Sequence, residues 1–113
     1  MVAGMVLFGA ALVIERVGAE SGPVQIIYEE AARYGVSGDW LYWVASCETG
    51  GTFNQSLVGR QGEIGIFQWH PRGLWSSVPV FQSWADVYDL RLNVRAAAWA
   101  FSRGLSFHWS CAR

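Results

Sequence analysis

The chain has 113 residues, enough for one domain and too few for two. Eight basic and nine acidic residues give a net charge of −1, so the basic excess typical of proteins that bind nucleic acid is absent, and we expect no nucleic-acid partner. Hydrophobic residues make up 52% of the chain and charged residues only 15%, which excludes a disordered chain.

The N-terminal part of the chain is strongly apolar. Residues 2–14 form an uninterrupted apolar run, too short for the roughly 20 residues of a membrane-spanning helix but typical of a signal-peptide core. Val17 and Ala19 suit the positions that a signal peptidase reads, so we expect cleavage after Ala19. An uncleaved anchor and a buried N-terminal helix are the alternatives. The chain therefore divides into a signal or hydrophobic segment (1–19) and a mature domain (20–113) without stable membrane insertion.

The first helix is expected near the start of the mature domain. Ser21 is the candidate N-cap, Pro23 fits the first turn, and Gly35 ends the helix. Five residues at helical spacing make up its apolar face: Val24, Ile27, Tyr28, Ala31 and Tyr34.

N-cap residues and apolar spacing predict two further helices. Ser37 is the N-cap candidate of the second helix, which ends just after Glu48. Its expected inner face consists of Trp40, Leu41, Val44 and Cys47. Asp89 begins the last helix, and Arg103 and Gly104 close it. Its expected inner face consists of Leu92, Ala96, Trp99 and Ala100.

Between these helices the chain is irregular. Four glycines and Pro71 interrupt residues 52–75, which indicates loops and a short hairpin or loop region at residues 62–69. The expected fold class is therefore mainly α, a small helical domain with this irregular segment beside its site.

The two cysteines, Cys47 and Cys111, lie 64 positions apart without the CxxC spacing of a zinc or redox site. A disulfide between them would fit an exported protein, and two separate buried thiols are the alternative. His70 and His108 have no partner at metal-ligand spacing, so we expect neither a metal nor a cofactor.

Glu48 is the first candidate for chemistry. Val44 and Ala45, one turn earlier, would shield it from water, and the terminal carbonyl groups of the helix would repel its anion; both effects raise its pKa. A carboxylic acid that stays protonated near neutral pH can protonate the leaving oxygen of a glycosidic bond. The alternative is an ordinary solvated glutamate in the last turn of a helix.

The segments around Glu48 carry a resemblance to a known superfamily. Residues 47–51 (CETGG), followed by Phe53, Asn54 and residues 62–69 (GEIGIFQW), resemble the goose-type and lytic transglycosylase (SLT) branch of the lysozyme superfamily. In that superfamily a Glu-Ser or Glu-Thr pair ends a helix, and a Gly-x-x-Gly-x-x-Gln segment follows across the cleft. The resemblance implies an α+β lysozyme-like fold.

Other segments indicate which branch of the superfamily the chain resembles most. Residues 45–51 and 109–111 are most similar to the resuscitation-promoting factor domains of actinobacteria, in which the cysteine before the catalytic glutamate pairs with one near the C-terminus. Residues 89–97 resemble a helix start that transglycosylase domains carry downstream. The likeness covers about residues 24–111, although the connection at 78–88 fits none of these families closely.

The resemblance assigns roles to single residues. Glu48 becomes the general acid, Thr49 stands where the family often has serine, and Gln68 lines the cleft. Gly65 stands where the backbone must approach the sugar closely. The family's extra donor to the catalytic carboxyl, often a late tyrosine, has only Tyr88 as a candidate.

Glu63 raises the question of a second carboxylate. Residues 63–68 also look like the segment of animal c-type lysozymes that bears a second catalytic acid two positions before a glycine, and two carboxylates would indicate hydrolysis. Single-glutamate transglycosylases instead let the sugar's own 6-hydroxyl attack. We expect Glu63 to be accessory; the alternative is a solvated hairpin residue, for which Arg60 is a candidate partner.

Seven tryptophans suit a protein that binds sugars, because pyranose rings stack on indoles. We assign Trp69 and Trp75 to the cleft, and Trp40, Trp43 and Trp99 to the core. The resulting expectation is a monomeric, secreted or wall-associated, extracytoplasmic enzyme that cleaves the β-1,4 bond between N-acetylmuramic acid and N-acetylglucosamine in peptidoglycan glycan strands. The alternative is a catalytically weak peptidoglycan-binding or signalling module of the same fold.

Overall fold

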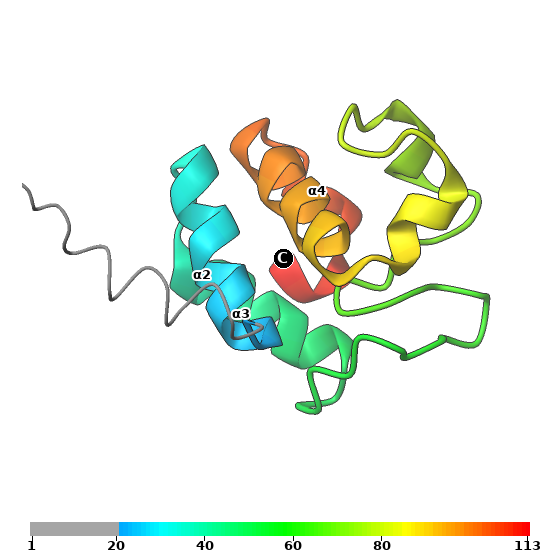
Figure 1. Cartoon of the computed structure of the whole chain (residues 1–113), viewed down its shortest axis with the longest axis horizontal. Helices are drawn as coiled ribbons and strands as arrows, with labels where there is room; N and C mark the ends of the chain where they lie inside the picture. Colours follow the sequence, from blue (N-terminus) through cyan, green and yellow to red (C-terminus); the bar gives the residue numbers. More distant parts are fainter. Residues whose placement is uncertain (1–20) are drawn as a thin grey trace, which may run out of the picture.

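The computed structural model describes residues 21–113, so the segment expected at 1–19 lies outside the described residues. Three α-helices form the body of the described chain: α2 (Pro23–Tyr34), α3 (Gly38–Glu48) and α4 (Leu90–Ser102). Helix α2 packs against both α3 and α4 (Figure 1). Short 3₁₀ helices complete the described chain: η1 (Leu74–Ser77), η2 (Trp84–Tyr88), η3 (Ser106–His108) and η4 (Ser110–Ala112). The prediction of a mainly helical domain is confirmed.

The ends of α2 follow the sequence signals, with one exception. Gly22 is the N-cap residue and makes no side-chain capping bond, so the assignment of this cap to Ser21 is wrong. Pro23 occupies the first helical position, where its missing N–H removes no helix bond. At the other end Gly35 adopts φ +69°, and its N–H donates to the carbonyl groups of Ala31 and Ala32. Glycine is favoured there because a left-handed backbone is strained for other residues.

The buried face of α2 is rotated from the predicted one. Val24 and Tyr28 are 39% and 41% exposed, whereas the buried residues of α2 are Ile26, Ile27, Glu30 and Ala31. The Tyr28 ring covers Gly38 at the start of α3, and its hydroxyl donates to the Asp39 carboxylate over 2.7 Å. Tyr28 therefore packs at the surface, over the contact between α2 and α3, and is not part of the core.

Helix α3 begins as predicted, because the Ser37 hydroxyl accepts a hydrogen bond from the Trp40 N–H. Its buried residues are Leu41, Val44 and Ala45. Trp43 is 67% exposed, so its assignment to the core is wrong; it lies about 100° around the helix from buried Val44. Trp40 packs against Phe101 of α4 with ring centroids 4.6 Å apart and ring planes tilted by 53°, and it is still 38% exposed.

Helix α4 also begins at the predicted residue. The Asp89 carboxylate accepts a hydrogen bond from the Leu92 N–H, which satisfies one of the free amides of the first turn. Ala96 and Ala100 are buried as expected, and Trp99 is partly buried beneath the Arg103 guanidinium.

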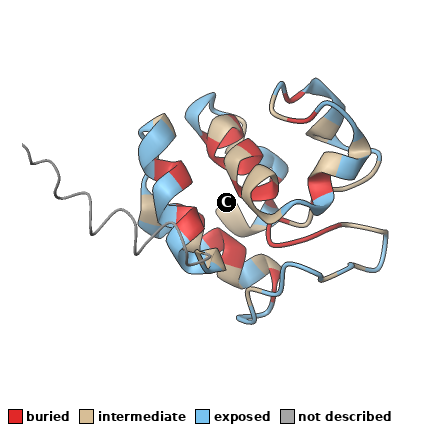
Figure 2. Cartoon of the chain, viewed as in Figure 1, coloured by how far each residue is buried: buried red, intermediate tan, exposed pale blue. Residues whose placement is uncertain are grey.

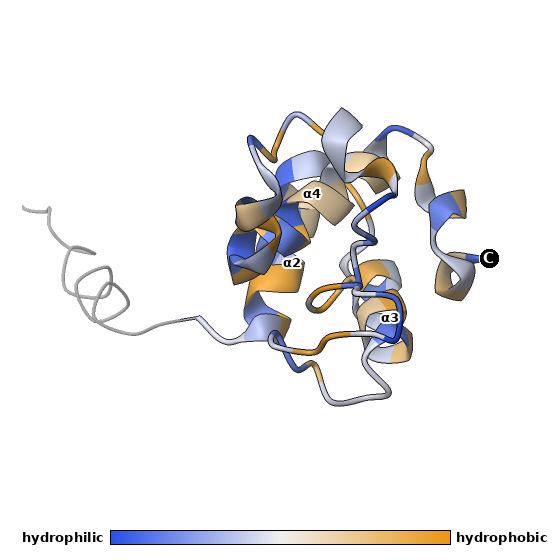
Figure 3. Ribbon diagram, turned by 90° about the vertical axis from the view of Figure 1, so that its right-hand side faces the viewer, coloured by the Kyte–Doolittle hydropathy of each residue, from blue (hydrophilic) through white to orange (hydrophobic). Residues whose placement is uncertain are grey.

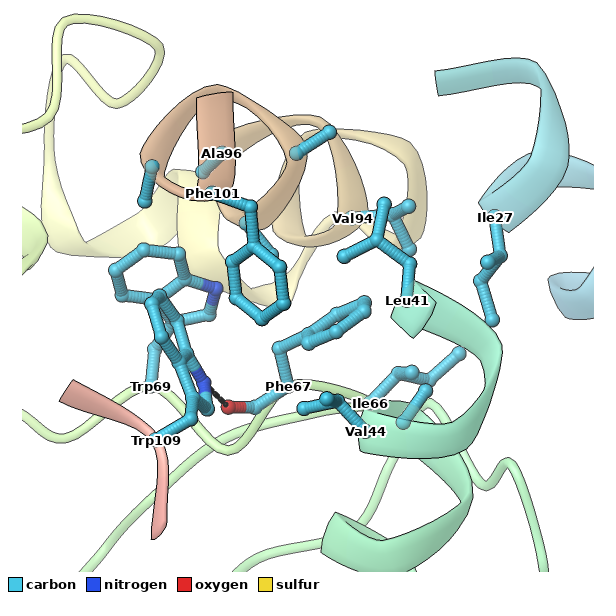
Figure 4. Packing of buried hydrophobic residues seen from close by; sticks show 14 of the residues in the cluster. Ile27, Leu41, Val44, Ile66, Phe67, Trp69, Val94, Ala96, Phe101 and Trp109 are labelled. Atoms are coloured by element: carbon cyan, nitrogen blue, oxygen red, sulfur yellow. Dashed lines mark hydrogen bonds between the residues drawn. The ribbon is translucent and has the colours of Figure 1, made fainter. Parts of the chain in front are cut away.

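The core lies where the inner faces of the helices meet the irregular segment (Figure 2). Each α-helix carries both hydrophobic and hydrophilic residues (Figure 3), and the hydrophobic positions of the three helices share this core. Phe67, fully buried, packs edge-on against Phe101, and its carbonyl oxygen accepts a hydrogen bond from the Trp109 indole over 2.8 Å (Figure 4). A residue of the irregular segment thus joins α4 to the C-terminal tail.

The hairpin expected at 62–69 does not form among the described residues. Only single bridges link Val58 with Ile64 and Ile64 with Trp69. Ile64 and Trp69 exchange both backbone hydrogen bonds, at 3.0 and 3.1 Å. Between them Gly65 and Gln68 adopt φ +81° and +49°, so the chain curls into a tight loop and does not continue as strands. The loop alternative of the prediction is the observed one.

Candidate active site

Glu48 is the last residue of α3 and lies partly buried in a pocket of about 270 Å³. The helix ends there because Thr49 and the two glycines after it leave the helical path, with Gly50 and Gly51 at positive φ. The pocket is lined by residues from three parts of the chain: Glu48, Glu63, Gln68, Trp69, His70, Gly73, Leu74, His108, Trp109 and Ser110. Four of the predicted site residues, Glu48, Glu63, Gln68 and Trp69, are therefore brought together.

A disulfide holds two of these parts together. Cys47 and Cys111 are bonded with Cα atoms 6.0 Å apart, which confirms the predicted pairing. Cys47 immediately precedes Glu48, and Cys111 immediately follows Ser110, so the bond fixes the C-terminal wall of the pocket beside the end of α3.

The environment of Glu48 disfavours its anion. Burial raises the pKa of its carboxyl group, and the negative charge of Glu63 raises it further. The predicted direction is confirmed, whereas its second cause differs from the expected helix carbonyls. Glu48 is thus suited to hold a proton at a higher pH than an ordinary glutamate.

Glu63 has the opposite environment. Backbone N–H groups of Glu63 itself and of Gln61 lower the pKa of its carboxyl group; the Gln61 N–H lies 2.8 Å from Oε1. Among residues 21–113 the ion pairs do not include Glu63 with Arg60, so the pairing with Arg60 is not observed, while the alternative of a solvated residue stays open. The pocket therefore combines one carboxyl group with a raised pKa and one with a lowered pKa.

The side chain of Gln68 is held by the backbone beneath it. Its Nε2 donates to the carbonyl groups of Gly65 and Leu57, at 2.9 and 3.3 Å. Its Oε1 and the Glu63 Oε1 both lie against the Cα of Gly59, where any side chain would collide with them. With its donors used, Gln68 retains an acceptor oxygen beside the Glu63 carboxylate.

Thr49 and Gly65 do not line the pocket. The Thr49 hydroxyl donates to the Ala45 carbonyl over 2.9 Å and accepts from the Phe53 N–H over 2.9 Å, so it caps α3 and fixes the following turn. Gly65 is buried against Asn93, whose Nδ2 would lie 2.5 Å from an added Cβ. Glycine is therefore needed at position 65 for packing against α4, whereas its expected close approach to a sugar stays a prediction.

The tryptophans expected in the cleft offer little surface. Trp69 touches the pocket but is only 2% exposed, and its indole N–H donates to the Asn93 carbonyl over 3.1 Å. Trp75 does not line the pocket; it packs against Trp84, and its N–H donates to the Pro71 carbonyl. Both rings make their contacts with other groups of the protein, so the surface of the pocket is mostly polar. Tyr88 is 57% exposed and lies outside the pocket.

Asn93 supports the pocket from behind and was not predicted. Its Nδ2 donates to the carbonyl groups of Ile64 and Val87, and its Oδ1 accepts from the Phe67 N–H, all within 2.9 to 3.1 Å. These bonds fasten the loop that carries Gln68 to α4. The signal was its position at helical spacing from inward-facing Ala96, which places a polar side chain on the buried face of α4.

Glu30 is a second buried polar residue that the sequence analysis missed. It is fully buried on α2, and its carboxylate accepts hydrogen bonds from Arg33, Arg91 and Arg95 at 2.8 to 3.2 Å. Burial alone would raise the pKa of this carboxyl group, but the bonds from Arg95 and Arg91 outweigh it and lower the pKa. The cluster joins α2 to α4, and Glu30 lies outside the pocket.

Comparison with known proteins found no matching family model, no matching curated protein and no matching solved structure. Within residues 21–113, no three His, Cys, Asp or Glu side chains are grouped so that they could hold a metal ion. No helix of the same region has both the length and the apolar character needed to cross a membrane.

Proposed function

We propose that this domain cleaves the β-1,4 bond between N-acetylmuramic acid and N-acetylglucosamine in peptidoglycan, as a muramidase or lytic transglycosylase of the lysozyme-like type. The observation that carries the proposal is the pairing of Glu48 with Glu63 in one pocket, the first with a raised pKa and the second with a lowered one. Two carboxyl groups whose environments separate their pKa values are typical of glycosidases. The likeness of residues 47–51 and 62–69 to that superfamily supports the same activity.

In this proposal Glu48 provides the acid and base steps. Its carboxylic acid donates a proton to the glycosidic oxygen as the bond to the muramic C1 breaks, and the proton leaves with the N-acetylglucosamine hydroxyl. The resulting Glu48 carboxylate then removes a proton from the attacking oxygen, either the muramic 6-hydroxyl or a water. The first route gives a 1,6-anhydro sugar and the second a reducing end.

Glu63 has an accessory role in this scheme. Its carboxylate, held in the charged form by backbone N–H groups, stabilises the positive charge that develops on the sugar ring. The same negative charge adds to burial in raising the pKa of Glu48, which favours its protonated form before the reaction. The Glu63 carboxylate therefore has two effects: it raises the pKa of Glu48 before the reaction, and it stabilises the charged transition state of the sugar.

The disulfide supports a place outside the cytoplasm, because such bonds persist in oxidising compartments. We propose a secreted or wall-associated protein that acts as a monomer on glycan strands and uses no cofactor.

The test is digestion of purified peptidoglycan with the chain and with its Glu48→Gln variant, followed by mass spectrometry of the released muropeptides. We expect release by the parent protein and a loss of about 10²- to 10⁴-fold in the variant. Anhydro and reducing ends differ in mass by one water, which separates transglycosylase from hydrolase. If neither protein releases muropeptides while both sediment with peptidoglycan, the chain is a binding or signalling module and the enzymatic proposal is wrong.

A further inference from the structure

His70 lies in the pocket wall, yet both of its ring nitrogens are engaged by the protein. The Arg72 N–H donates to Nδ1 over 3.0 Å, which requires a lone pair on Nδ1. The proton of the neutral ring is then on Nε2, and this group donates to the Gln61 side-chain oxygen over 3.0 Å. His70 can therefore bind a ligand by hydrogen bonds only if it first gives up one of these contacts.

These contacts continue to the second carboxylate of the pocket. Gln61, whose side chain His70 holds, donates its backbone N–H to the Glu63 Oε1 over 2.8 Å. The backbone of the same turn is closed by bonds from Gly59 N–H to the Glu63 carbonyl and from Gly62 N–H to the Gly59 carbonyl. The Gln61 side chain thus connects the turn that carries Glu63 to the ring of His70.

We propose that His70 is a positioning residue, which acts through Gln61 to hold the Glu63 carboxylate in place beside Glu48. The role of Glu63 in catalysis rests on the proposed function, whereas the mechanical link from His70 to Glu63 does not. Four titratable groups line this pocket with His70 or lie against its ring: Glu48, Glu63, His108 and Arg72. Of these, Arg72 donates its backbone N–H to the ring, and Glu63 lies near enough that a charge on the ring would lower the Glu63 pKa directly.

Two neutral substitutions separate the two contacts of His70. In His70→Asn the short side chain still accepts from the Arg72 N–H but does not reach Gln61. In His70→Gln the longer amide reaches the position of Nε2 and donates to Gln61. Neither variant can carry a charge, so both lose any direct electrostatic effect of the ring on Glu63 equally, and a difference between them reports the contact with Gln61. Gln61→Ala removes the same contact from its other end and leaves His70 intact.

The first measurement is the pKa of the Glu63 carboxyl group, followed by NMR as a function of pH in the whole chain. We expect the pKa to rise in His70→Asn and in Gln61→Ala, and to stay nearer the parent value in His70→Gln. Ser37→Ala, which removes the cap of α3 far from the turn, controls for general loosening and is expected to leave the Glu63 pKa unchanged. Equal Glu63 pKa values in His70→Asn and His70→Gln would overturn the proposal.

The second measurement is muropeptide release in a double-mutant cycle with Glu63→Gln. Loss of one hydrogen bond predicts about a 3- to 10-fold decrease for His70→Asn in the parent protein. In the Glu63→Gln background we expect no further decrease, because the group being positioned is already neutral. An equal decrease in both backgrounds would show that His70 acts independently of Glu63. If the parent protein releases nothing, the proposed function fails, and the Glu63 pKa comparison still decides the role of His70.

Discussion

Glu63 and Glu48 face the same pocket, and the charge of Glu63 adds to burial in raising the Glu48 pKa. The two residues arrive there from different elements, Glu48 at the end of α3 and Glu63 in the turn before Ile64. The effect depends on keeping Glu63 ionised, which its backbone N–H donors do. Each carboxyl group therefore has a distinct and testable relation to pH.

Glu48→Gln should stabilise the fold at neutral pH while it removes activity. A carboxyl group whose folded pKa is raised contributes stability fully below its unfolded pKa, and this contribution is lost as the pH rises through the folded pKa. Glutamine imitates the neutral form at every pH. Thermal unfolding should show a higher Tm than the parent at pH 7 and a gain that shrinks toward pH 4. An equal gain at both pH values would contradict the raised pKa.

Glu63→Gln should reduce muropeptide release by about 5- to 150-fold, which corresponds to ~1–3 kcal/mol of lost charge stabilisation in the transition state. The loss should be smaller than in Glu48→Gln, because the proton donor remains. The variant should also lower the Glu48 pKa, since one cause of its elevation is removed. Equal abolition of activity by both substitutions, with reducing-end products from the parent, would instead make Glu63 an essential second carboxylate.

Gly65→Ala should destabilise the fold more than Gly104→Ala does. Both glycines have left-handed backbones, φ +81° and +76°, but only Gly65 has the Asn93 amide in the space of a Cβ. We expect ~1–2 kcal/mol for Gly104→Ala from backbone strain and a further ~1–3 kcal/mol for Gly65→Ala from overpacking. Urea unfolding of the two variants measures the difference. Similar losses would mean that the Asn93 contact relaxes without cost.

The sequence predicted the helices well because their ends depend on local chemistry. Ser37, Asp89 and Gly35 act on backbone groups within four residues, so each cap could be identified from the chain alone. The inward face of α2 was predicted less well, because Tyr28 takes its place from Gly38 and Asp39, eleven residues away at most. The spacing of apolar residues within one helix does not show which residues of another helix a side chain will contact.

For the candidate site, the sequence predicted several residues that line the pocket but not the residues that hold them in place. Glu48, Glu63 and Gln68 meet in one pocket, whereas Thr49, Gly65 and Trp75 serve the fold around it. Thr49 and Trp75 are held by neighbours four residues away, the Ala45 and Pro71 carbonyl groups, whereas Gly65 is held by the distant Asn93. Asn93 also bonds Ile64 and Phe67, so the choice between a hairpin and a loop at 62–69 depends on a partner that the local sequence does not show.

Glu30→Gln should weaken the fold by about 1–3 kcal/mol, because both Glu30 oxygens accept from arginines and glutamine keeps only one of these acceptors. The amide NH2 that replaces the other oxygen faces guanidinium donors and cannot bond them. The Glu30 pKa is lowered in the folded protein, so its contribution is present above the unfolded pKa and is lost as the pH falls through the folded one. The variant should therefore flatten the acid side of the stability profile. Glu29→Gln is the matched control: Glu29 is exposed, also bonds Arg91, and should cost less than ~1 kcal/mol. Equal losses in urea unfolding would contradict the special role of burial.

Replacement of Cys47 and Cys111 by serine should cost ~4 kcal/mol of unfolding free energy, because the bond closes a loop of 64 positions in the unfolded chain. The variant should also release fewer muropeptides, since His108 and Ser110 lose their tether beside Glu48. Urea unfolding in the absence of reductant measures the first effect. A variant with unchanged stability and activity would show that packing of Trp109 holds the tail by itself.

All residues that line the pocket lie between Cys47 and Cys111, so the whole site is carried on a single covalent ring. A protease that cuts this ring once, for example after exposed Arg72, converts the ring into an open chain whose two pieces remain joined. Such a nick divides the backbone without releasing any wall of the pocket. The nicked protein would migrate as one species in a gel without reductant and as two fragments with it, and the site would tolerate a broken backbone for as long as the sulfur bridge remains.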